Sequence, residues 1–469
     1  MKLTIIGGGG VRMPAFVRAV LATRPDMFSE ICLLEPDGAR RETICRLAVE
    51  LAASLGRPGT VRVTSDPADA FTGADYVFSA IRVGGDRGRV IDEEVALRRG
   101  LVGQETTGAA GCAMALRTIP VVLGYCDLLA SLSPAAVLIN FTNPAGLITQ
   151  AISAHGKVKV VGVCDTPAGT IEHLAAFLGI GGLGSAGHDL SGAYAGLNHL
   201  GWVCSLRADG VERIDEALGR FEELQRADHV FAAFDPALVR RVGAIPTEYL
   251  YYFYDSRRYV DGIVSAGASR GRDVQRLNQE LLAALGKAFS DGDVDDAWSA
   301  YELVLGVRRD TYMRADTDGD NGQGEARARR AATGAQAITD ASIGGYEGLA
   351  LRVIDGLAGR GRQQVIVNTA AGASLGLDPA DVVEVPATVD ANGLSPLPVP
   401  RLPRPALGLV MQVKEYERGI VEAAMTGNAE LASVALSQHP LVPGSTAARG
   451  LIADYAELHG PDLAYLLRR

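Results

Sequence analysis

The stretch LTIIGGGG (residues 3–10) places a short apolar run directly before four glycines, and a helical pattern follows at Ala15–Thr23. An apolar run of this length predicts a buried β-strand. Glycines in the next turn let backbone N–H groups approach a pyrophosphate at the N-terminus of a helix. The third glycine of the full dinucleotide fingerprint is missing, because Met13 or its neighbours hold that position. A purely steric use of glycine in a tight turn is the alternative interpretation.

Glu35 follows the next predicted strand, Glu30–Leu34. An acidic side chain there can accept hydrogen bonds from both ribose hydroxyls and disfavours a 2′-phosphate, which favours NAD over NADP. A solvated strand end is the alternative for the same residue.

Further β-rich runs alternate with helical stretches over the first third of the chain. This alternation predicts an α/β fold with a doubly wound parallel sheet, the Rossmann arrangement, over residues 1–181. The expected strands are Leu3–Ile6, Glu30–Leu34, Tyr76–Ile81, Ala136–Asn140 and Lys159–Val163, with helices at Ala15–Thr23, Ala39–Leu55 and Ile119–Leu132.

The pattern changes at about Gly182, and residues 182–469 are predicted to form an α+β catalytic and oligomerisation domain. Residues 314–330 are polar and rich in Gly and Asp, which predicts a mobile surface loop. The Pro-rich segment Ser395–Pro405 predicts an extended connection. The expected strands are Ala193–Leu197 and Trp202–Leu206, and the expected helices are Val211–Ala227, Asp273–Phe289, Val294–Leu305, Val410–Thr426, Ala429–Gln438 and Gly444–Leu458.

Composition bounds the possible partners. The formal net charge of −10 argues against nucleic acid or an anionic membrane surface, and local arginines must therefore hold any anionic substrate. The apolar start is too short for a signal peptide, and no uninterrupted apolar run approaches the ~20 residues of a membrane span. Six scattered cysteines without CxxC pairs are typical of free thiols. We expect a cytoplasmic protein.

Chemistry-bearing residues gather after several of the predicted strands. The segment Ile81–Pro120 concentrates Gly, Arg, Asp, Gln, Glu and Thr, and the run NFTNP ends at Pro144 on the same predicted rim. Carboxyl ends of parallel strands form the ligand crevice in such sheets, so we favour a functional interpretation over a polar loop with a capped helix.

Cys164, at another strand end, and His199, in the run GLNHLGW, can supply half of a divalent-metal site, with substrate oxygens supplying the rest. A buried cysteine that acts as a small apolar group, and a histidine satisfied by a hydrogen bond, are the alternatives. The run IPTEYLYYFY holds four tyrosines, which suits aromatic packing. A functional interpretation needs one tyrosine near a cation to act as base.

Together these residues resemble glycoside hydrolase family 4, from the first strand to the C-terminal helices. The resemblance rests on TIIGGGG, IRVGG with RxxDE, VGQETTG, ALRTIP, NFTNPAG, GVCDTP, GLNHLGW, IPTEYLYYFY, LRVID, VEVPATVD and VKEYERGIVEAAMTG. It implies a Rossmann domain and a catalytic domain akin to the lactate/malate dehydrogenase fold. It also implies NAD, a divalent metal (usually Mn²⁺) and an elimination mechanism, for which this family is an exception to two-carboxylate glycoside hydrolysis.

The resemblance also implies residue roles. Cys164 and His199 match the metal ligands, Tyr249 matches the catalytic base, and Asp165 matches a proposed leaving-group acid. Arg89, Asn143, Asn198 and, within a residue or two, Arg270 match the substrate contacts. The implied cofactor residues are Gly7, Gly8, Gly9, Gly10, Glu35 and Arg82.

In the implied mechanism, hydride leaves C3, Tyr249 takes the C2 proton, the aglycone leaves C1, water adds and the hydride returns. The contexts GLNHL, IPTEYL and RVGGDRGR favour the 6-phospho-β-glucosidase branch, whereas Asp165 is associated with α-specific members. The expected substrate is a phosphorylated glycoside, and a homodimer or homotetramer is common in the family.

Other activities remain open at this point. They are a 6-phospho-α-glucosidase or unphosphorylated glycosidase of the same family, a 2-hydroxy-acid dehydrogenase on the same fold, and a non-catalytic NAD sensor.

Overall fold

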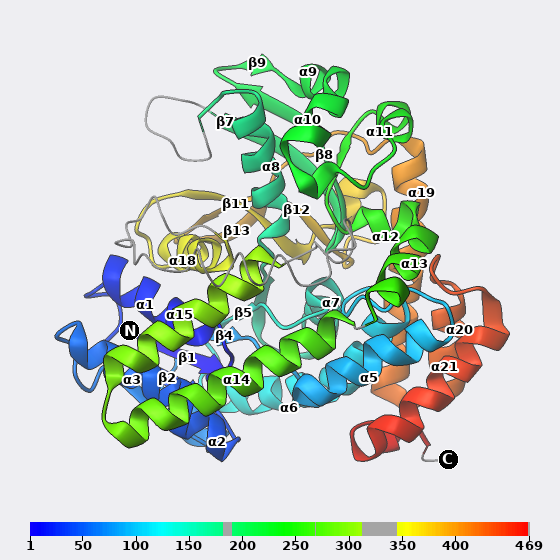
Figure 1. Ribbon diagram of the computed structural model, residues 1–469. Coiled ribbons are helices and arrows are strands. Elements are labelled where there is room, and N and C mark those ends of the chain that lie inside the picture. Colours follow the sequence, from blue (N-terminus) through cyan, green and yellow to red (C-terminus); the bar gives the residue numbers. More distant parts are fainter. Residues whose placement is uncertain (182–189, 268, 312–344, 468–469) are drawn as a thin grey trace.

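The computed structural model of the chain describes residues 1–181, 190–267, 269–311 and 345–467 (Figure 1). Its strands join in a single 13-stranded sheet with helices on both faces. The order along the sheet is β10-β8-β7-β12-β11-β6-β5-β4-β1-β2-β3, with β13 beside β12 and β9 beside β8. The strands are β1 (Lys2–Ile6), β2 (Glu30–Leu34), β3 (Val61–Thr64), β4 (Tyr76–Ser79), β5 (Val137–Asn140), β6 (Lys159–Gly162), β7 (Leu190–Leu197), β8 (Leu200–Ala208), β9 (Val211–Glu212), β10 (Ile245–Pro246), β11 (Gln363–Ala370), β12 (Val382–Asp390) and β13 (Gly393–Pro396).

The first six strands pair in parallel in the order 3-2-1-4-5-6, which is the doubly wound Rossmann order. The predicted fold class is therefore confirmed. The order reverses between β1 and β4, and the glycine turn follows β1. This switch point is where such sheets bind ligands, so the topology itself places the cleft.

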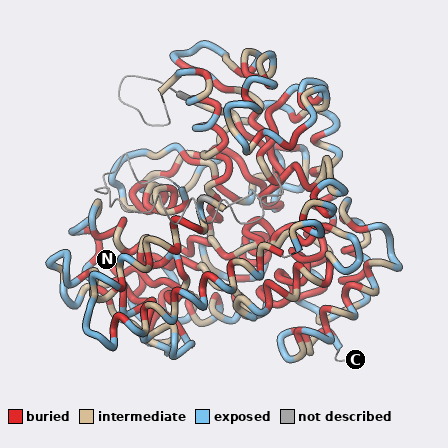
Figure 2. Tube along the Cα trace, viewed as in Figure 1, coloured by how far each residue is buried: buried red, intermediate tan, exposed pale blue. Residues whose placement is uncertain are grey.

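Alternate side chains of these strands enter separate cores. Leu3, Ile5 and Leu33 pack under one set of helices, whereas Ile6 and Leu34 pack under the other set. Burial on both faces explains why these strands are almost continuously apolar. Figure 2 shows the buried trace running through the middle of the molecule.

Helices α1, α3 and α18 cover one face, and α4, α6 and α7 cover the other. The C-terminal helices, orange to red in Figure 1, pack on α5 and α6. The helices are α1 (Met13–Thr23), α2 (Gly38–Arg40), α3 (Arg46–Ser54), α4 (Pro67–Phe71), α5 (Gly85–Arg98), α6 (Gly108–Leu132), α7 (Ala145–His155), α8 (Thr166–Phe177), α9 (Ile214–Gly219), α10 (Phe221–Ala227), α11 (Pro236–Val242), α12 (Leu250–Tyr254), α13 (Ser256–Ala266), α14 (Arg270–Asp291), α15 (Val294–Asp310), α18 (Gly345–Leu357), α19 (Arg404–Thr426), α20 (Ala429–Ser437) and α21 (Gly444–His459).

The parallel sheet continues into the second half of the chain. β11 pairs antiparallel with β6, and β12 then joins it to β7. The domain boundary at residues 181 and 182 stays a prediction, because residues 182–189 lie outside the described part. The loop expected at residues 314–330 also lies outside it.

Three expectations for individual elements need correction. Val211–Ala227 is not one helix, since β9, α9 and α10 divide it with breaks at Arg213 and Arg220. The extended connection Ser395–Pro405 ends early, because α19 begins at Arg404 with a proline in its first turn. Strands β11 and β12 were not among the expected strands.

Helix α6 is long and apolar enough by length and composition to cross a membrane, and 67% of its most apolar window is buried within the protein. Its apolar side chains pack in the core between α5, α7 and α19. A fully buried ion pair fixes its position, because Arg117 donates two hydrogen bonds to Asp92 of α5, at 2.6 and 2.7 Å. Arg117 Nε also donates to Val83 O at 3.4 Å, which ties this core to the turn before α5.

Candidate active site

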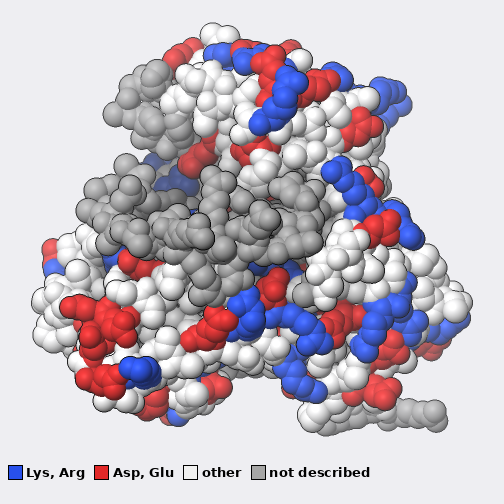
Figure 3. Space-filling view, in the orientation of Figure 1, with Lys and Arg blue, Asp and Glu red and all other residues white. Residues whose placement is uncertain are grey.

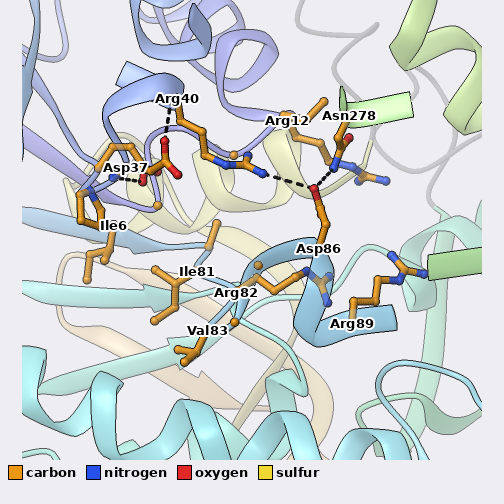
Figure 4. Close-up of a pocket in the computed structure, with 18 of the residues that line it drawn as sticks. Ile6, Arg12, Asp37, Arg40, Ile81, Arg82, Val83, Asp86, Arg89 and Asn278 are labelled. Carbon is orange, nitrogen blue, oxygen red and sulfur yellow. Dashed lines mark hydrogen bonds and ion pairs between the residues drawn. The ribbon is translucent and has the colours of Figure 1, made fainter. Parts of the chain in front are cut away.

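A cavity of about 450 Å³ lies at the switch point of the sheet (Figure 4). One end is formed by the glycine turn and the loop after β2, and its floor includes the turn from Ile81 to Gly85. The other end reaches Arg89 and, on α14 and α15, Asn278 and Arg308. The cleft is thus lined both by residues that follow the parallel strands and by residues of helices in the second half of the chain. On the face of the molecule in Figure 3, basic and acidic side chains are interspersed.

The glycine turn is closely packed and cannot hold larger residues. Gly7 has a φ of +83°, and Cβ atoms added to Gly8 and Gly9 would lie 2.6 Å from Leu33 Cβ and Glu35 Oε2. The N–H groups of Gly7 and Gly8 donate to Leu34 O, and Gly10 N–H closes the turn on Gly7 O. Helix α1 then begins at Met13. Gly7 and Gly10 line the cleft, and the N–H groups of all four glycines are engaged within the protein, so these glycines allow close backbone approach rather than supply free donors.

Glu35 is buried beside this turn and is not a solvated strand end. Its Oε2 accepts the Gly9 N–H at 2.9 Å, and its Oε1 accepts the Asp37 N–H at 2.9 Å. Each oxygen keeps a further lone pair, so the carboxylate can still accept from a ribose hydroxyl.

Two predicted arginines meet on one carboxylate that we did not single out from the sequence. Glu105 Oε2 lies 2.7 Å from Arg82 Nη1 and 3.0 Å from Arg89 Nη1. Burial alone would raise the pKa of Glu105, but the two guanidinium groups lower it to about 2. Arg89 also donates to Glu93 Oε1 at 2.8 Å. Arg82 and Arg89 are therefore held as one ionic group with Glu93 and Glu105.

Arg270 begins α14, and Gly271 N–H donates to Glu93 Oε2 at 2.6 Å, so this helix start lies against the partner of Arg89. Arg270 donates to Arg308 O at 2.8 Å. Burial and the charges of Arg12, Arg89 and Arg270 lower the pKa of Arg308 to about 9. Guanidinium groups gathered in this way can hold a phosphate.

Cys164 and His199 are brought together by β6 and the turn between β7 and β8. Cys164 Sγ lies 3.6 Å from His199 Nε2, about the separation of two such ligands on one tetrahedral metal ion, given ~2.3 Å metal–sulfur and ~2.0 Å metal–nitrogen bonds. Thr106 Oγ1 lies 2.8 Å from His199 Nδ1, which directs Nε2 toward the thiol. His199 has a φ of +61°, a strained value for a non-glycine residue.

The electrostatics of this pair fit a bound cation. Burial, then Glu384 and Asp165, raise the pKa of the Cys164 thiol well above its ordinary range. Burial lowers the pKa of His199 to about 3, so the imidazole is neutral and can ligate. A cation would favour the thiolate by taking the proton's place. Among the described residues, no group of three His, Cys, Asp or Glu side chains could hold a metal alone. The donor set therefore fits a metal that also binds substrate oxygens.

Tyr249 stacks on the His199 imidazole, with ring centroids 3.7 Å apart and planes at 9°. Tyr249 is 9% exposed, and Tyr254, the fourth tyrosine of the run, is half-buried. Tyr251 and Tyr252 are each 1% exposed and pack in the core. The cluster therefore divides into one candidate base and a packing face.

Asp165 precedes α8 and is half-buried. The charge of Asp165 acts on the carboxyl groups of Glu248 and Glu384. Burial raises the pKa of Glu248 to about 7, and burial also raises that of Glu384 to about 7, with Asp165 adding to both shifts. Asp165 and Glu384 thus both act electrostatically on Cys164.

The two predicted asparagines occupy different settings. Asn143 follows β5 on the rim and is half-buried. Asn198 lies in the turn before His199, and its Nδ2 donates to Glu384 Oε1 at 3.2 Å. Glu384, on β12, also accepts from Tyr194 and from Asn368 of β11, at 2.7 and 2.9 Å. Glu384 thus holds the turn between β7 and β8 that carries His199. In the sequence, Glu384 lies in the run VEVPATVD.

Two family models match most of the chain. The model of the family 4 glycosyl hydrolases matches residues 2–180, and the model of that family's C-terminal domain matches residues 194–442. The chain belongs to glycoside hydrolase family 4. The resemblance drawn from the sequence is confirmed, and so is the expectation of a glycosidase.

Relatives of both anomeric preferences align along the whole chain. A Bacillus subtilis protein named as a probable 6-phospho-beta-glucosidase is 29% identical and covers 98% of this chain and 96% of its own. A maltose-6′-phosphate glucosidase from Bacillus subtilis is 26% identical, with 97% and 95% covered. The solved 6-phospho-beta glucosidase of Thermotoga maritima, with manganese, NAD⁺ and glucose 6-phosphate, has a TM-score of 0.76 at 25% identity, with 98% of both chains covered.

Proposed function

We propose that this glycosidase hydrolyses 6-phospho-β-glucosides with NAD and a divalent metal, Mn²⁺ or a similar ion. The observation that carries the proposal is the stack of Tyr249 on His199, with Cys164 Sγ 3.6 Å from the same imidazole. A glycosidase that acts by direct displacement needs two carboxyl groups that flank the glycosidic bond. A tyrosine stacked on a proposed metal ligand is instead suited to removing a proton.

NAD is placed in the 450 Å³ cleft, with its pyrophosphate at the glycine turn and its adenosine ribose at Glu35. Arg82 would border the cofactor, and its link to Glu105 keeps it at the edge of the substrate site. The solved relatives with NAD support this cofactor.

We place the sugar phosphate at Arg89 and Arg270, because the Arg89 side chain and the N–H group after Arg270 both donate to Glu93, with Asn143 on the rim. Arginine offers paired donors to phosphate oxygens, and burial beside Glu93 and Glu105 fixes the Arg89 guanidinium before substrate arrives. Asn198 is placed at the sugar hydroxyls, held by Glu384.

NAD bound in the cleft would supply hydride transfer at C3, and a metal held by Cys164 and His199 would supply polarisation of the adjacent oxygen, which would make the C2 proton acidic. Tyr249 takes that proton. Asp165, the residue after Cys164, gives a proton to the departing aglycone oxygen, and Thr106 holds His199 in position throughout. Because C1–O cleavage follows deprotonation, neither anomer demands an opposed nucleophile.

The β preference rests on the GLNHL, IPTEYL and RVGGDRGR contexts and on the full-length relative named for β-glucosides. Asp165 and the maltose-6′-phosphate glucosidases favour the α alternative. An unphosphorylated glycoside and a 2-hydroxy-acid dehydrogenase reaction are further alternatives. A homodimer or homotetramer in the cytoplasm completes the proposal.

The test is a matched pair of nitrophenyl glucoside 6-phosphates, α and β, each assayed with and without NAD, Mn²⁺ and reductant. We expect nitrophenol release that needs both cofactors, is faster with the β anomer and produces no net NADH. Faster release from the α anomer would reverse the anomeric assignment. Stoichiometric NADH from a hydroxy acid, with no nitrophenol, would replace the glycosidase by a dehydrogenase.

A further inference from the structure

We infer that Asp86 determines dinucleotide selectivity by withholding Arg40 from the adenosine end of the cleft. This inference rests on the placement of NAD proposed above. It concerns which dinucleotide binds and does not depend on the sugar substrate.

Arg40 is the residue that could accept NADP. It lines the cleft five residues after Glu35, where an arginine commonly binds the 2′-phosphate of NADP. Here the guanidinium is already engaged. Its Nη1 donates to Gly9 O at 2.9 Å, and its Nη2 lies 3.3 Å from Asp86 Oδ2. Figure 4 shows the Arg40 side chain reaching toward Asp86, on the side away from Asp37.

Asp86 is itself fixed from the other side. It lies in the first turn of α5, and Asn278 Nδ2 donates to its Oδ2 at 2.8 Å. Arg308 Nη1 in turn donates to Asn278 Oδ1 at 2.9 Å. Because α14 and α15 hold this carboxylate in place, the attraction on Arg40 has a fixed direction, and the arginine cannot turn toward the ribose without losing a charge-assisted contact.

The second arginine of this loop is also engaged. Arg41 Nη1 donates to Glu35 O at 2.9 Å and to Pro36 O at 2.7 Å. Glu35 disfavours a 2′-phosphate directly, and Asp86 engages Arg40, the arginine of this loop that lines the cleft and could compensate. Selectivity for NAD is divided between two carboxylates, one on each side of the cleft.

The experiment measures the affinities of NAD and NADP for the whole protein by titration calorimetry, without sugar. Asp86→Asn removes the charge that holds Arg40 and keeps the side-chain size. We expect the affinity for NADP relative to NAD to rise about ten-fold, the size of one charge-assisted hydrogen bond. Glu42→Gln is the matched control, because Glu42 is an exposed carboxylate two residues after Arg40. It should leave the ratio of NADP affinity to NAD affinity within two-fold of the wild type.

Two further variants decide what a negative result means. In an Arg40→Ala background, Asp86→Asn gives no gain in NADP affinity, because the released group is missing. A gain that persists there overturns the inference. Glu35→Gln tests the placement of NAD. If it weakens NAD binding while Asp86→Asn leaves the ratio unchanged, the inference alone is wrong. If neither variant changes the binding of either dinucleotide, the placement of NAD and the inference both fall.

Discussion

The dinucleotide cleft and the metal-side cluster are built in opposite ways. The glycine turn and Glu35 lie within the first 35 residues, and the turn is held mainly by hydrogen bonds from its backbone groups. Cys164, His199 and Tyr249 come from three separate segments and meet through side chains. The difference teaches that the cleft depends on close steric fit, whereas the cluster depends on the chemistry of a few atoms. Binding and chemistry should therefore respond to different substitutions.

The largest expected effect is on the base. Tyr249→Phe keeps the ring that stacks on His199 and removes the hydroxyl, so we expect turnover to fall about 10³-fold, within the range of general-base catalysis. Affinity for NAD should stay unchanged, as measured by titration. Tyr252→Phe, in the buried packing face, is the control and should change turnover by only a few-fold. Turnover by Tyr249→Phe near the wild-type rate would remove Tyr249 from the chemistry.

The next effect concerns the orientation of His199. Thr106→Val removes the hydroxyl 2.8 Å from His199 Nδ1, and we expect Mn²⁺ affinity to fall about 10- to 100-fold. Thr107→Val removes a neighbouring hydroxyl whose contact is with Gln104, and it should leave metal affinity unchanged. Equal losses in the two variants, measured by metal titration, would mean that the helix start matters and the contact to His199 does not.

A smaller effect tests the steric fit of the cleft. A Cβ at Gly9 would lie 2.6 Å from Glu35 Oε2 and 2.7 Å from Arg40 Cβ, so Gly9→Ala should weaken NAD binding about ten-fold. Turnover at saturating NAD should recover. Gly286→Ala, in α14, meets nothing within 4 Å and should leave NAD binding unchanged. Lost turnover at saturating NAD would show that the two regions are not separable.

The last prediction concerns the stability of the fold and comes from His439, which accepts a hydrogen bond from Gly108 N–H at the start of α6. Burial lowers the pKa of His439 to about 3 from its ordinary 6.5, so the folded chain keeps this imidazole neutral while the unfolded chain protonates below 6.5. The free energy of unfolding should fall between pH 6.5 and 3 by about 1.4 kcal/mol per pH unit from this group. The free energy of unfolding of His439→Gln, measured by urea titration at pH 6 and pH 5, should change less between the two pH values than that of the wild type. An equal change in both proteins would contradict the assignment.

The same comparison explains what the sequence could predict. Residues 3–10 and Glu35 are close in sequence, and local rules fix their strand, turn and helix, so both reached the cleft as expected. Glu384 and Thr106 were not identified, because their roles arise only when β12 lies beside β7 and when α6 begins beside the β7–β8 turn. The family resemblance supplied Cys164, His199 and Tyr249, which spacing alone left open.

Hydrogen exchange at C2 tests the central claim most directly. Nitrophenyl β-glucoside 6-phosphate would be hydrolysed in D₂O with NAD and Mn²⁺, and the glucose 6-phosphate produced would be examined by mass spectrometry and proton NMR. Removal of the C2 proton by Tyr249 followed by addition of water predicts deuterium at C2. A product that carries only protium at C2 would contradict the elimination mechanism and the role of Tyr249.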